Sequence, residues 1–166
     1  MSLRWRKDIQ PLLDKGLYDE IDLKFQKYCE IYPNDSITHS LYGYFLHYQR
    51  EYIKSEELFC KSLKLDNNNV LCMNYYTDVL CVQKKWKQAK IIALKAFNIN
   101  NERSWTIGSL CNVLRHLNDI NEVKNICQHA IKMYKKLNDT DMWLTLADSC
   151  WDLKLYDISI KLFEIG

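Results

Sequence analysis

Seven cysteines and four histidines are the side chains of this sequence that could hold a metal or act as nucleophile and base. The cysteines are odd in number and scattered, with no Cys-x-x-Cys pair and no Cys/His group at zinc spacing. His47 and His116 are expected to face the same side of the fold, but two histidines without a third ligand make a poor metal site. The sequence also lacks a phosphate-cradling glycine loop and a Gly-x-Ser-x-Gly elbow. We therefore predict no enzyme activity, no cofactor and no metal.

Charge and hydropathy exclude further classes of function. The chain has 23 basic and 21 acidic residues, a formal net charge of +2, so we expect neither a nucleic-acid partner nor a membrane partner. No apolar run approaches the roughly 18 residues needed to span a bilayer. The first residues lack an apolar signal core. A cytoplasmic protein is expected, or a nuclear one if the source is eukaryotic.

Residues 36–69 and 70–103 form two units of 34 residues with the same skeleton. Matching positions are Tyr52 and Trp86, Ser55 and Ala89, Ser62 and Ala96, Leu65 and Ile99, and Asn67 and Asn101. Each unit holds two apolar stripes at helical spacing around a short polar break, which predicts a helical hairpin. One hairpin cannot bury its apolar faces alone, so we expect stacked hairpins that contact mainly their neighbours.

The same register predicts about five repeats in one domain, 1–166, with boundaries at 2–35, 36–69, 70–103, 104–139 and 140–166. It places Cys111, Cys127 and Cys150 in the core, where a reduced thiol behaves as a small apolar residue. Cys81 falls on the inner side, which makes it the candidate for a redox-sensitive thiol.

The first and last repeats are irregular. In the first, Ile9, Ile21 and Tyr28 stand where small residues are expected. Pro11 disfavours a helix interior, so this helix is predicted to kink there or to start near Pro11 with Asp8 as its cap. The fifth repeat is incomplete, and we predict Asp141 or Thr140 as its cap.

This pattern resembles the tetratricopeptide repeat (TPR) family over essentially the whole chain. The fifth repeat fits the family's large, small and aromatic positions with Trp143, Leu146, Ala147, Tyr156, Ser159, Phe163 and Gly166. The resemblance implies an all-α, right-handed superhelical solenoid of antiparallel helix pairs. A related helical-hairpin array with a similar period is the alternative.

In TPR proteins the first helices of the repeats line a concave groove that binds a peptide or a partner protein. The residues that the resemblance places in this groove are Tyr44, His47, Tyr48, Asn74, Asp78, Trp105, Asn112, Arg115 and Trp151. The fifth repeat adds Asp141, Leu144, Asp148 and Asp152 to the same face. We expect the middle of the groove to be apolar and aromatic, because aromatic side chains often anchor interfaces.

Two alternatives limit this interpretation. A chaperone-type carboxylate clamp is excluded, because Leu41, Leu71 and Tyr75 stand where side chains able to bind a carboxylate are needed. Some of the tyrosines and tryptophans assigned to the groove could instead pack only between neighbouring helices.

The resemblance implies a non-catalytic scaffold or adaptor that binds a protein or peptide. The alternative is a structural subunit that self-associates as a homodimer through a terminal repeat, similar to TPR subunits of the anaphase-promoting complex. This alternative rests on the irregular first repeat and on apolar residues near the C-terminus: Leu155, Ile158, Ile160, Leu162, Phe163 and Ile165. We expect a second copy, or a continuation of the chain, to cover them.

Overall fold

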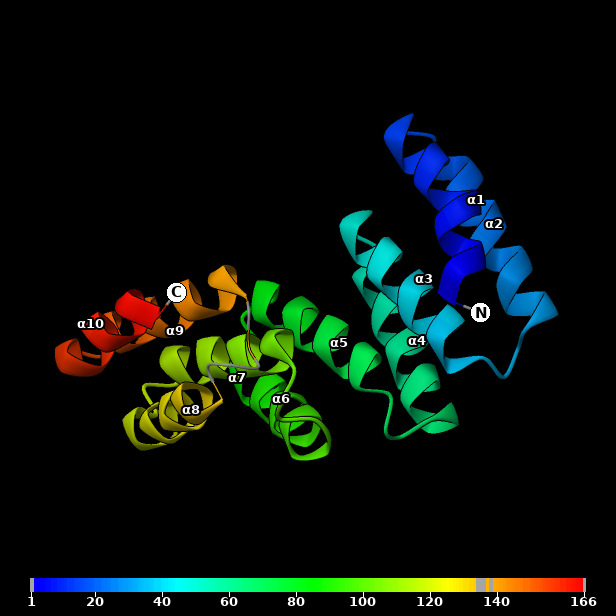
Figure 1. Cartoon of the computed structure of the whole chain (residues 1–166). Helices are drawn as coiled ribbons and strands as arrows, with labels where there is room; N and C mark the ends of the chain where they lie inside the picture. Colours follow the sequence, from blue (N-terminus) through cyan, green and yellow to red (C-terminus); the bar gives the residue numbers. More distant parts are fainter. Residues whose placement is uncertain (1, 134–136, 138, 166) are drawn as a thin grey trace. The chain divides into compact units, whose positions relative to one another are not determined.

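The computed structural model describes residues 2–133, 137 and 139–165, with side chains described from Lys7 onward. Within these residues the chain forms ten α-helices and no strand (Figure 1). The helices are α1 (Ser2–Asp14), α2 (Tyr18–Ile31), α3 (Ser36–Tyr48), α4 (Tyr52–Leu65), α5 (Val70–Val82), α6 (Trp86–Ile99), α7 (Ser104–His116), α8 (Ile120–Lys132), α9 (Thr140–Asp152) and α10 (Tyr156–Ile165). The predicted all-α fold of paired helices is confirmed. No helix in the described part is long and apolar enough to span a bilayer.

Contacts between residues divide the chain into two compact units, Met1–Cys72 and Met73–Gly166. The first unit holds α1 to α4 and the first residues of α5, and the second holds the rest of α5 and the helices that follow. The expected single domain of five repeats stays a prediction.

In the first unit, α3 and α4 pack closely because small residues lie between them. Ser55 donates a hydrogen bond to the carbonyl oxygen of Gly43 at 2.7 Å, and Ser62 donates one to the carbonyl oxygen of Ser36 at 2.7 Å. Both serines are fully buried. The small side chains therefore allow the close approach, and their hydroxyl groups satisfy their hydrogen bonding within it.

The first hairpin differs from the prediction. Helix α1 runs from Ser2 to Asp14 with Pro11 inside it, so the predicted start near Pro11 with Asp8 as cap is wrong. The Asp8 carboxylate instead accepts a hydrogen bond from the Tyr28 hydroxyl group of α2. Ile9 and Ile21 are fully buried. This hairpin therefore packs through large apolar side chains where the next one uses serine and glycine.

In the second unit, the core positions follow the register. Ala89 and Ala96 of α6 are completely buried, and Ala89 packs with Leu80 and Val113. The predicted core cysteines are likewise buried, and they belong to a larger apolar cluster formed with residues such as Leu110, Leu114 and Leu146. The prediction that these three cysteines are buried in the core is confirmed.

Each hairpin turns through a residue in the left-handed backbone region. These residues are Gly16 (φ 69°), Arg50 (φ 65°), Lys84 (φ 58°), Asn118 (φ 55°) and Lys154 (φ 61°). Glycine adopts this conformation without strain and asparagine tolerates it, but arginine and lysine do so at a cost. The repeated turn is therefore imposed by the packing of the hairpins more than by local sequence.

Helix α10 covers more of its apolar surface than expected. Leu162 is fully buried, and Leu155, Ile158 and Ile165 pack against the core of the second unit. Of the six apolar residues predicted to need a cover, Ile160 and Phe163 are the exposed ones, at 52% and 45%. Of the other four, Leu162 is buried and three are partly buried, so the packing of α10 covers only part of the predicted apolar end, and its cover by a second copy stays a prediction.

Candidate functional site

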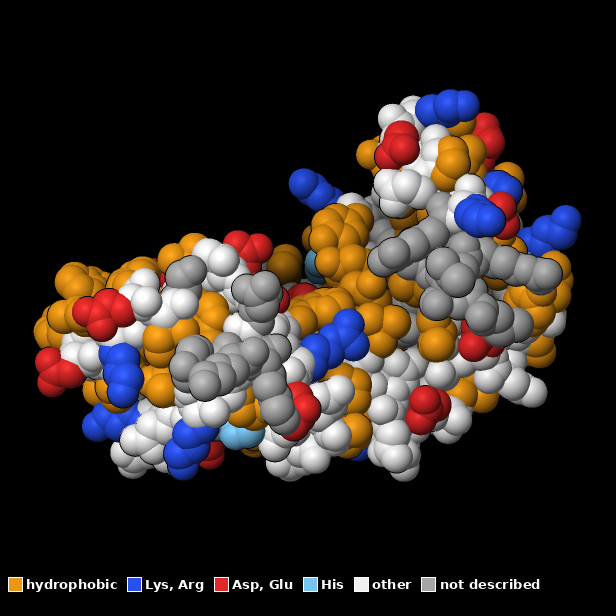
Figure 2. Space-filling model, viewed as in Figure 1, with side chains coloured by type: hydrophobic (Ala, Val, Ile, Leu, Met, Phe, Trp, Pro, Cys, Tyr) orange, Lys and Arg blue, Asp and Glu red, His pale blue; other side chains and the backbone are white. Residues whose placement is uncertain are grey.

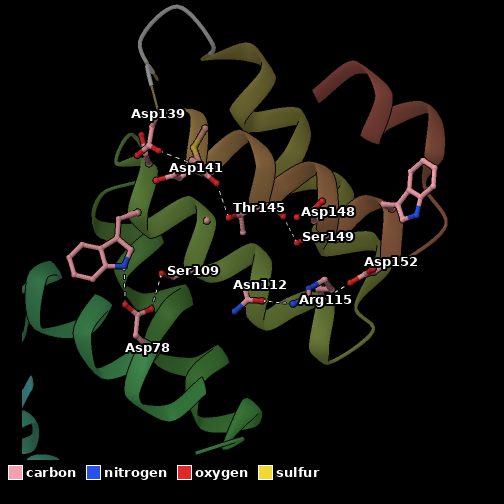
Figure 3. A pocket seen from close by; sticks show the side chains of 15 residues that line it. Asp78, Ser109, Asn112, Arg115, Asp139, Asp141, Thr145, Asp148, Ser149 and Asp152 are labelled. Carbon is pink, nitrogen blue, oxygen red and sulfur yellow. Dashed lines mark hydrogen bonds and ion pairs between the residues drawn. The ribbon is translucent and has the colours of Figure 1, made fainter. Parts of the chain in front are cut away.

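The second unit contains a cavity of about 680 Å³, shown in Figure 3. Its lining comes from α5, from α7, and from α9 with the residue before it. These are the first helices of three consecutive hairpins. The lining residues are Asp78, Ser104, Trp105, Gly108, Ser109, Asn112, Arg115, Asp139, Asp141, Met142, Thr145, Asp148, Ser149, Trp151 and Asp152.

One end of the cavity is built on the start of α9. Asp139 accepts a hydrogen bond from the backbone N–H of Met142 at 3.0 Å and thereby caps the helix. The prediction of Asp141 or Thr140 as cap is therefore wrong by one or two residues. Because Asp139 takes the capping role, Asp141 lies in the first turn with its side chain exposed, and Figure 3 shows both carboxylates at the same end of the cavity.

Asp78 organises the contact between α5 and α7. Its carboxylate accepts hydrogen bonds from the indole Nε1 of Trp105 at 3.1 Å and from the hydroxyl group of Ser109 at 3.3 Å. Burial raises the pKa of Asp78 to about 6, although both hydrogen bonds act in the opposite direction. The Trp105 ring is also held edge-on against Tyr75, with ring centroids 5.0 Å apart. Trp105 is thus fixed in orientation before any partner arrives.

Arg115 is the single cation among the described residues that line the cavity. It donates hydrogen bonds to the carboxylate of Asp152 at 2.5 Å and to the side-chain oxygen of Asn112 at 2.8 Å. Figure 3 shows this group at the opposite end from Asp139 and Asp141. Since Asp152 neutralises Arg115, the remaining lining charge is that of the other carboxylates.

Two of these carboxylates have no partner among the residues that the structure describes. Among the described residues, no hydrogen bond or ion pair is made by the carboxylates of Asp141 and Asp148, and both side chains are exposed. In the same described part, no group of three or more His, Cys, Asp or Glu side chains could hold a metal ion. Within the described residues, the cavity therefore offers negative charge but no cluster of metal ligands.

The structure brings together five of the residues assigned to the groove from the sequence: Asp78, Trp105, Asn112, Arg115 and Trp151. Asn74 is different, because it is 1% exposed and donates a hydrogen bond to the hydroxyl group of Thr106 at 3.0 Å. It does not line the cavity.

The other three assigned residues lie on α3 in the first unit. The hydroxyl groups of Tyr44 and Tyr48 are 2.7 Å apart, and Tyr48 is 65% exposed. His47 is buried, burial lowers its pKa, and its Nδ1 makes no hydrogen bond within the described residues. A binding role for these three residues stays a proposal.

The expectation of an apolar middle does not hold for this cavity. Asp139, Asp141, Asp148 and Asp152 give it a charged wall, and the serines and threonine beside them add polar groups. The register places Asp141, Asp148 and Asp152 on the groove face. The expectation of an apolar middle does not include the combined charge of these three carboxylates. Counting acidic against basic residues along that face would have found the signal.

Solved structures share this fold. PilF of Pseudomonas aeruginosa aligns with 94% of this chain and 70% of its own, at 20% identity and a TM-score of 0.74. MamA of Desulfovibrio magneticus RS-1, in a form from residue 41 to the end, aligns with 97% of this chain and 92% of its own, at 18% identity and a TM-score of 0.74. Another MamA structure aligns with 97% and 87%, at 14% identity and a TM-score of 0.73.

No protein-family model matches the sequence, and no curated protein matches it either. At these identities the structural likeness concerns the fold. PilF and MamA contain TPRs, so this chain has the fold of a TPR-like helical solenoid.

Proposed function

We propose that this chain is a non-catalytic protein-interaction module that holds a basic segment of a partner protein in the cavity of the second unit. The observation that carries the proposal is the cavity lining, which combines five aspartates and one arginine with two tryptophans.

Charge supports a basic partner. Asp152 pairs with Arg115, Asp139 caps α9, and Asp78 is held by Trp105 and Ser109. The carboxylates of Asp141 and Asp148 are therefore the groups left to receive a partner's cations. Asp141 and Asp148 lie two turns apart on α9, so each would receive its own Lys or Arg side chain through charge-assisted hydrogen bonds, which are stronger than neutral ones.

The two tryptophans supply contact area next to these charges. Trp151 is 54% exposed, and its ring meets Tyr156 edge-on at 5.1 Å between centroids. Trp105 is half-buried and already lies beneath the guanidinium group of Arg103, 5.5 Å from the ring centroid. An indole face attracts cations in this way. Fixed aromatic rings beside unpaired carboxylates therefore suit a segment that contains Lys or Arg.

The face of the second unit shown in Figure 2 does not have the charge pattern of a nucleic-acid-binding surface. On the face of the second unit in Figure 2, the described acidic and basic side chains are interspersed with hydrophobic ones, and no continuous basic stripe is drawn there. A basic stripe would be expected for a backbone-phosphate binder. A cytoplasmic location and self-association stay predictions, and light scattering over a concentration series tests the second of these.

The experiment is a selection from a random peptide library displayed on phage, followed by fluorescence-anisotropy titration of the selected peptides. We expect enrichment of Lys and Arg, and hydrogen-exchange protection on α7 and α9 when a peptide binds. The double substitution D141N/D148N should weaken binding at least about tenfold, and raising the salt concentration should weaken it further.

Two controls sharpen this test. D157N/E164Q removes the same number of charges from α10 outside the cavity and should leave affinity unchanged. W105A should weaken binding by about 2 kcal/mol if Trp105 is an anchor, with an unchanged circular dichroism spectrum. Selected peptides without basic residues would contradict the proposal. So would hydrogen-exchange protection confined to α6, α8 and α10, the second helices of these hairpins.

A further inference from the structure

Three buried thiols meet in the core of the second unit. Cys111 of α7, Cys127 of α8 and Cys150 of α9 are each 0% exposed. The sulfur atoms of Cys127 and Cys150 are 3.3 Å apart, and Cys127 also interacts with the thiol of Cys111. The register predicts each of these cysteines as a small apolar core residue, but periodicity alone does not show that the three thiols meet.

The pair Cys127–Cys150 is the one placed for a covalent link. A disulfide has a sulfur–sulfur distance of about 2.05 Å, so the two atoms need to approach by only about 1.3 Å. The pair joins α8 of one hairpin to α9 of the next. A link between Cys111 and Cys127 would instead join two helices that a short turn already connects.

We propose that Cys127 and Cys150 form a reversible disulfide when the chain meets a low-molecular-weight disulfide oxidant such as oxidised glutathione. The thiolate of Cys150 attacks one sulfur of the oxidant, which forms a mixed disulfide and releases one glutathione thiolate. Cys127 then loses its proton to solvent, attacks the Cys150 sulfur and releases the second glutathione. Two thiols of the chain are oxidised to one disulfide, and the oxidant is reduced to two thiols.

The hydrogen bonding within the trio supports this order of attack. Contacts with Cys111 and Cys150, followed by burial, raise the pKa of Cys127. The hydrogen bond shared with Cys127 lowers the pKa of Cys150, although burial opposes this effect. Cys150 is therefore the thiol that ionises first and attacks first.

Burial sets the rate of the reaction. Since both thiols are inaccessible in the closed fold, exchange has to pass through transient opening of the packing between α8 and α9. Once formed, the link ties those helices together and removes this opening. The link also holds in place the part of α9 that carries Ser149 and Trp151, which flank Cys150 and line the cavity.

The experiment compares the reduced whole chain with the chain incubated with oxidised glutathione, in a Cys60→Ser background. Cys60 is exposed, so its removal prevents mixed disulfides and cross-linking between copies at that position. Intact-mass measurement should show the loss of two hydrogen atoms. Trypsin digestion without reductant should link the peptide 125–132, which holds Cys127, to the peptide 137–154, which holds Cys150.

Thermal unfolding gives a second measurement. The oxidised chain should melt roughly 5 to 10 °C higher than the reduced chain, and dithiothreitol should reverse the change. Cys127→Ala and Cys150→Ala should each abolish the link, whereas Cys111→Ala should retain it. Differential alkylation of the wild-type chain gives the same information without a core substitution.

Three results would overturn the proposal. One is a link from the Cys127 peptide to the peptide 104–115, which holds Cys111. The second is a chain that carries only glutathione adducts. The third is that Cys127 and Cys150 both remain reduced, and are still alkylated after unfolding, when Cys29 and Cys81 have already been oxidised by glutathione.

Discussion

Replacing Gly43 with alanine tests the close packing of α3 on α4. A Cβ atom at this position would lie 3.1 Å from the backbone oxygen of Ser55, and 3.3 Å from Leu58 Cβ and from Phe59 Cε1. These distances are shorter than the 3.5–4.0 Å at which non-bonded carbon atoms attract. The nearest atom belongs to the backbone of α4, so the clash can be relieved only by moving that helix.

The expected magnitude follows from two opposing effects. Overpacking a core site typically costs about 1–3 kcal/mol. Alanine in a helix interior is more stable than glycine by about 0.5–1 kcal/mol. We therefore expect Gly43→Ala to lower the free energy of unfolding by about 1–2 kcal/mol. Urea denaturation followed by far-ultraviolet circular dichroism measures it.

Gly108 is the matched control, because it lies inside α7 and has room for a side chain. A Cβ atom there would have Met142 Cγ as its nearest neighbour, at an ordinary contact distance of 3.8 Å. Gly108→Ala should therefore raise the free energy of unfolding by about 0.5–1 kcal/mol. If Gly43→Ala proves as stable as the wild type, the α3–α4 crossing has more space than the structure shows, and the reasoning fails.

Three further predictions concern the second unit. Ala89→Leu should cost about 1–3 kcal/mol of stability, because Ala89 is fully buried, and an unchanged urea midpoint with an unchanged slope would contradict this. Lys84→Gly should raise stability by about 0.5–1 kcal/mol, since relief of left-handed strain exceeds the entropy cost of glycine; a lower melting temperature would count against it. The pKa of Asp78 is raised from 3.8 to about 6 in the folded state, so the folded chain binds the extra proton between those values and loses stability as pH rises through that window. Asp78→Asn should flatten this loss between pH 4 and pH 7, measured as the free energy of unfolding, and a parallel pH profile for the two proteins would refute it.

The sequence alone was sufficient to predict the helices and many of the residues that they bury. A repeat of 34 residues, lengthened to 36 in the unit 104–139, marks where helices begin and end, because each hairpin needs an apolar face on both helices and a polar break between them. Positions such as Ala89, Ala96 and Cys111 are buried by that periodicity alone, and the structure confirms them. The predicted helix start near Pro11 failed, because the general cost of proline says nothing about the particular contacts that keep α1 helical on either side of it.

The sequence predicts which face of its helix each residue of the candidate site occupies, but not how these residues pair with one another. Periodicity assigns each residue to a face, so Asp78, Trp105, Asn112, Arg115 and Trp151 could be placed on one side of their helices. It cannot say which of them neutralise one another, because that depends on distances between helices. The pairing of Arg115 with Asp152 and the contact of Cys127 with Cys150 both join residues from different hairpins. Only the tertiary packing of α7, α8 and α9 brings those side chains within bonding distance, and with it decides which charges and thiols remain available for chemistry.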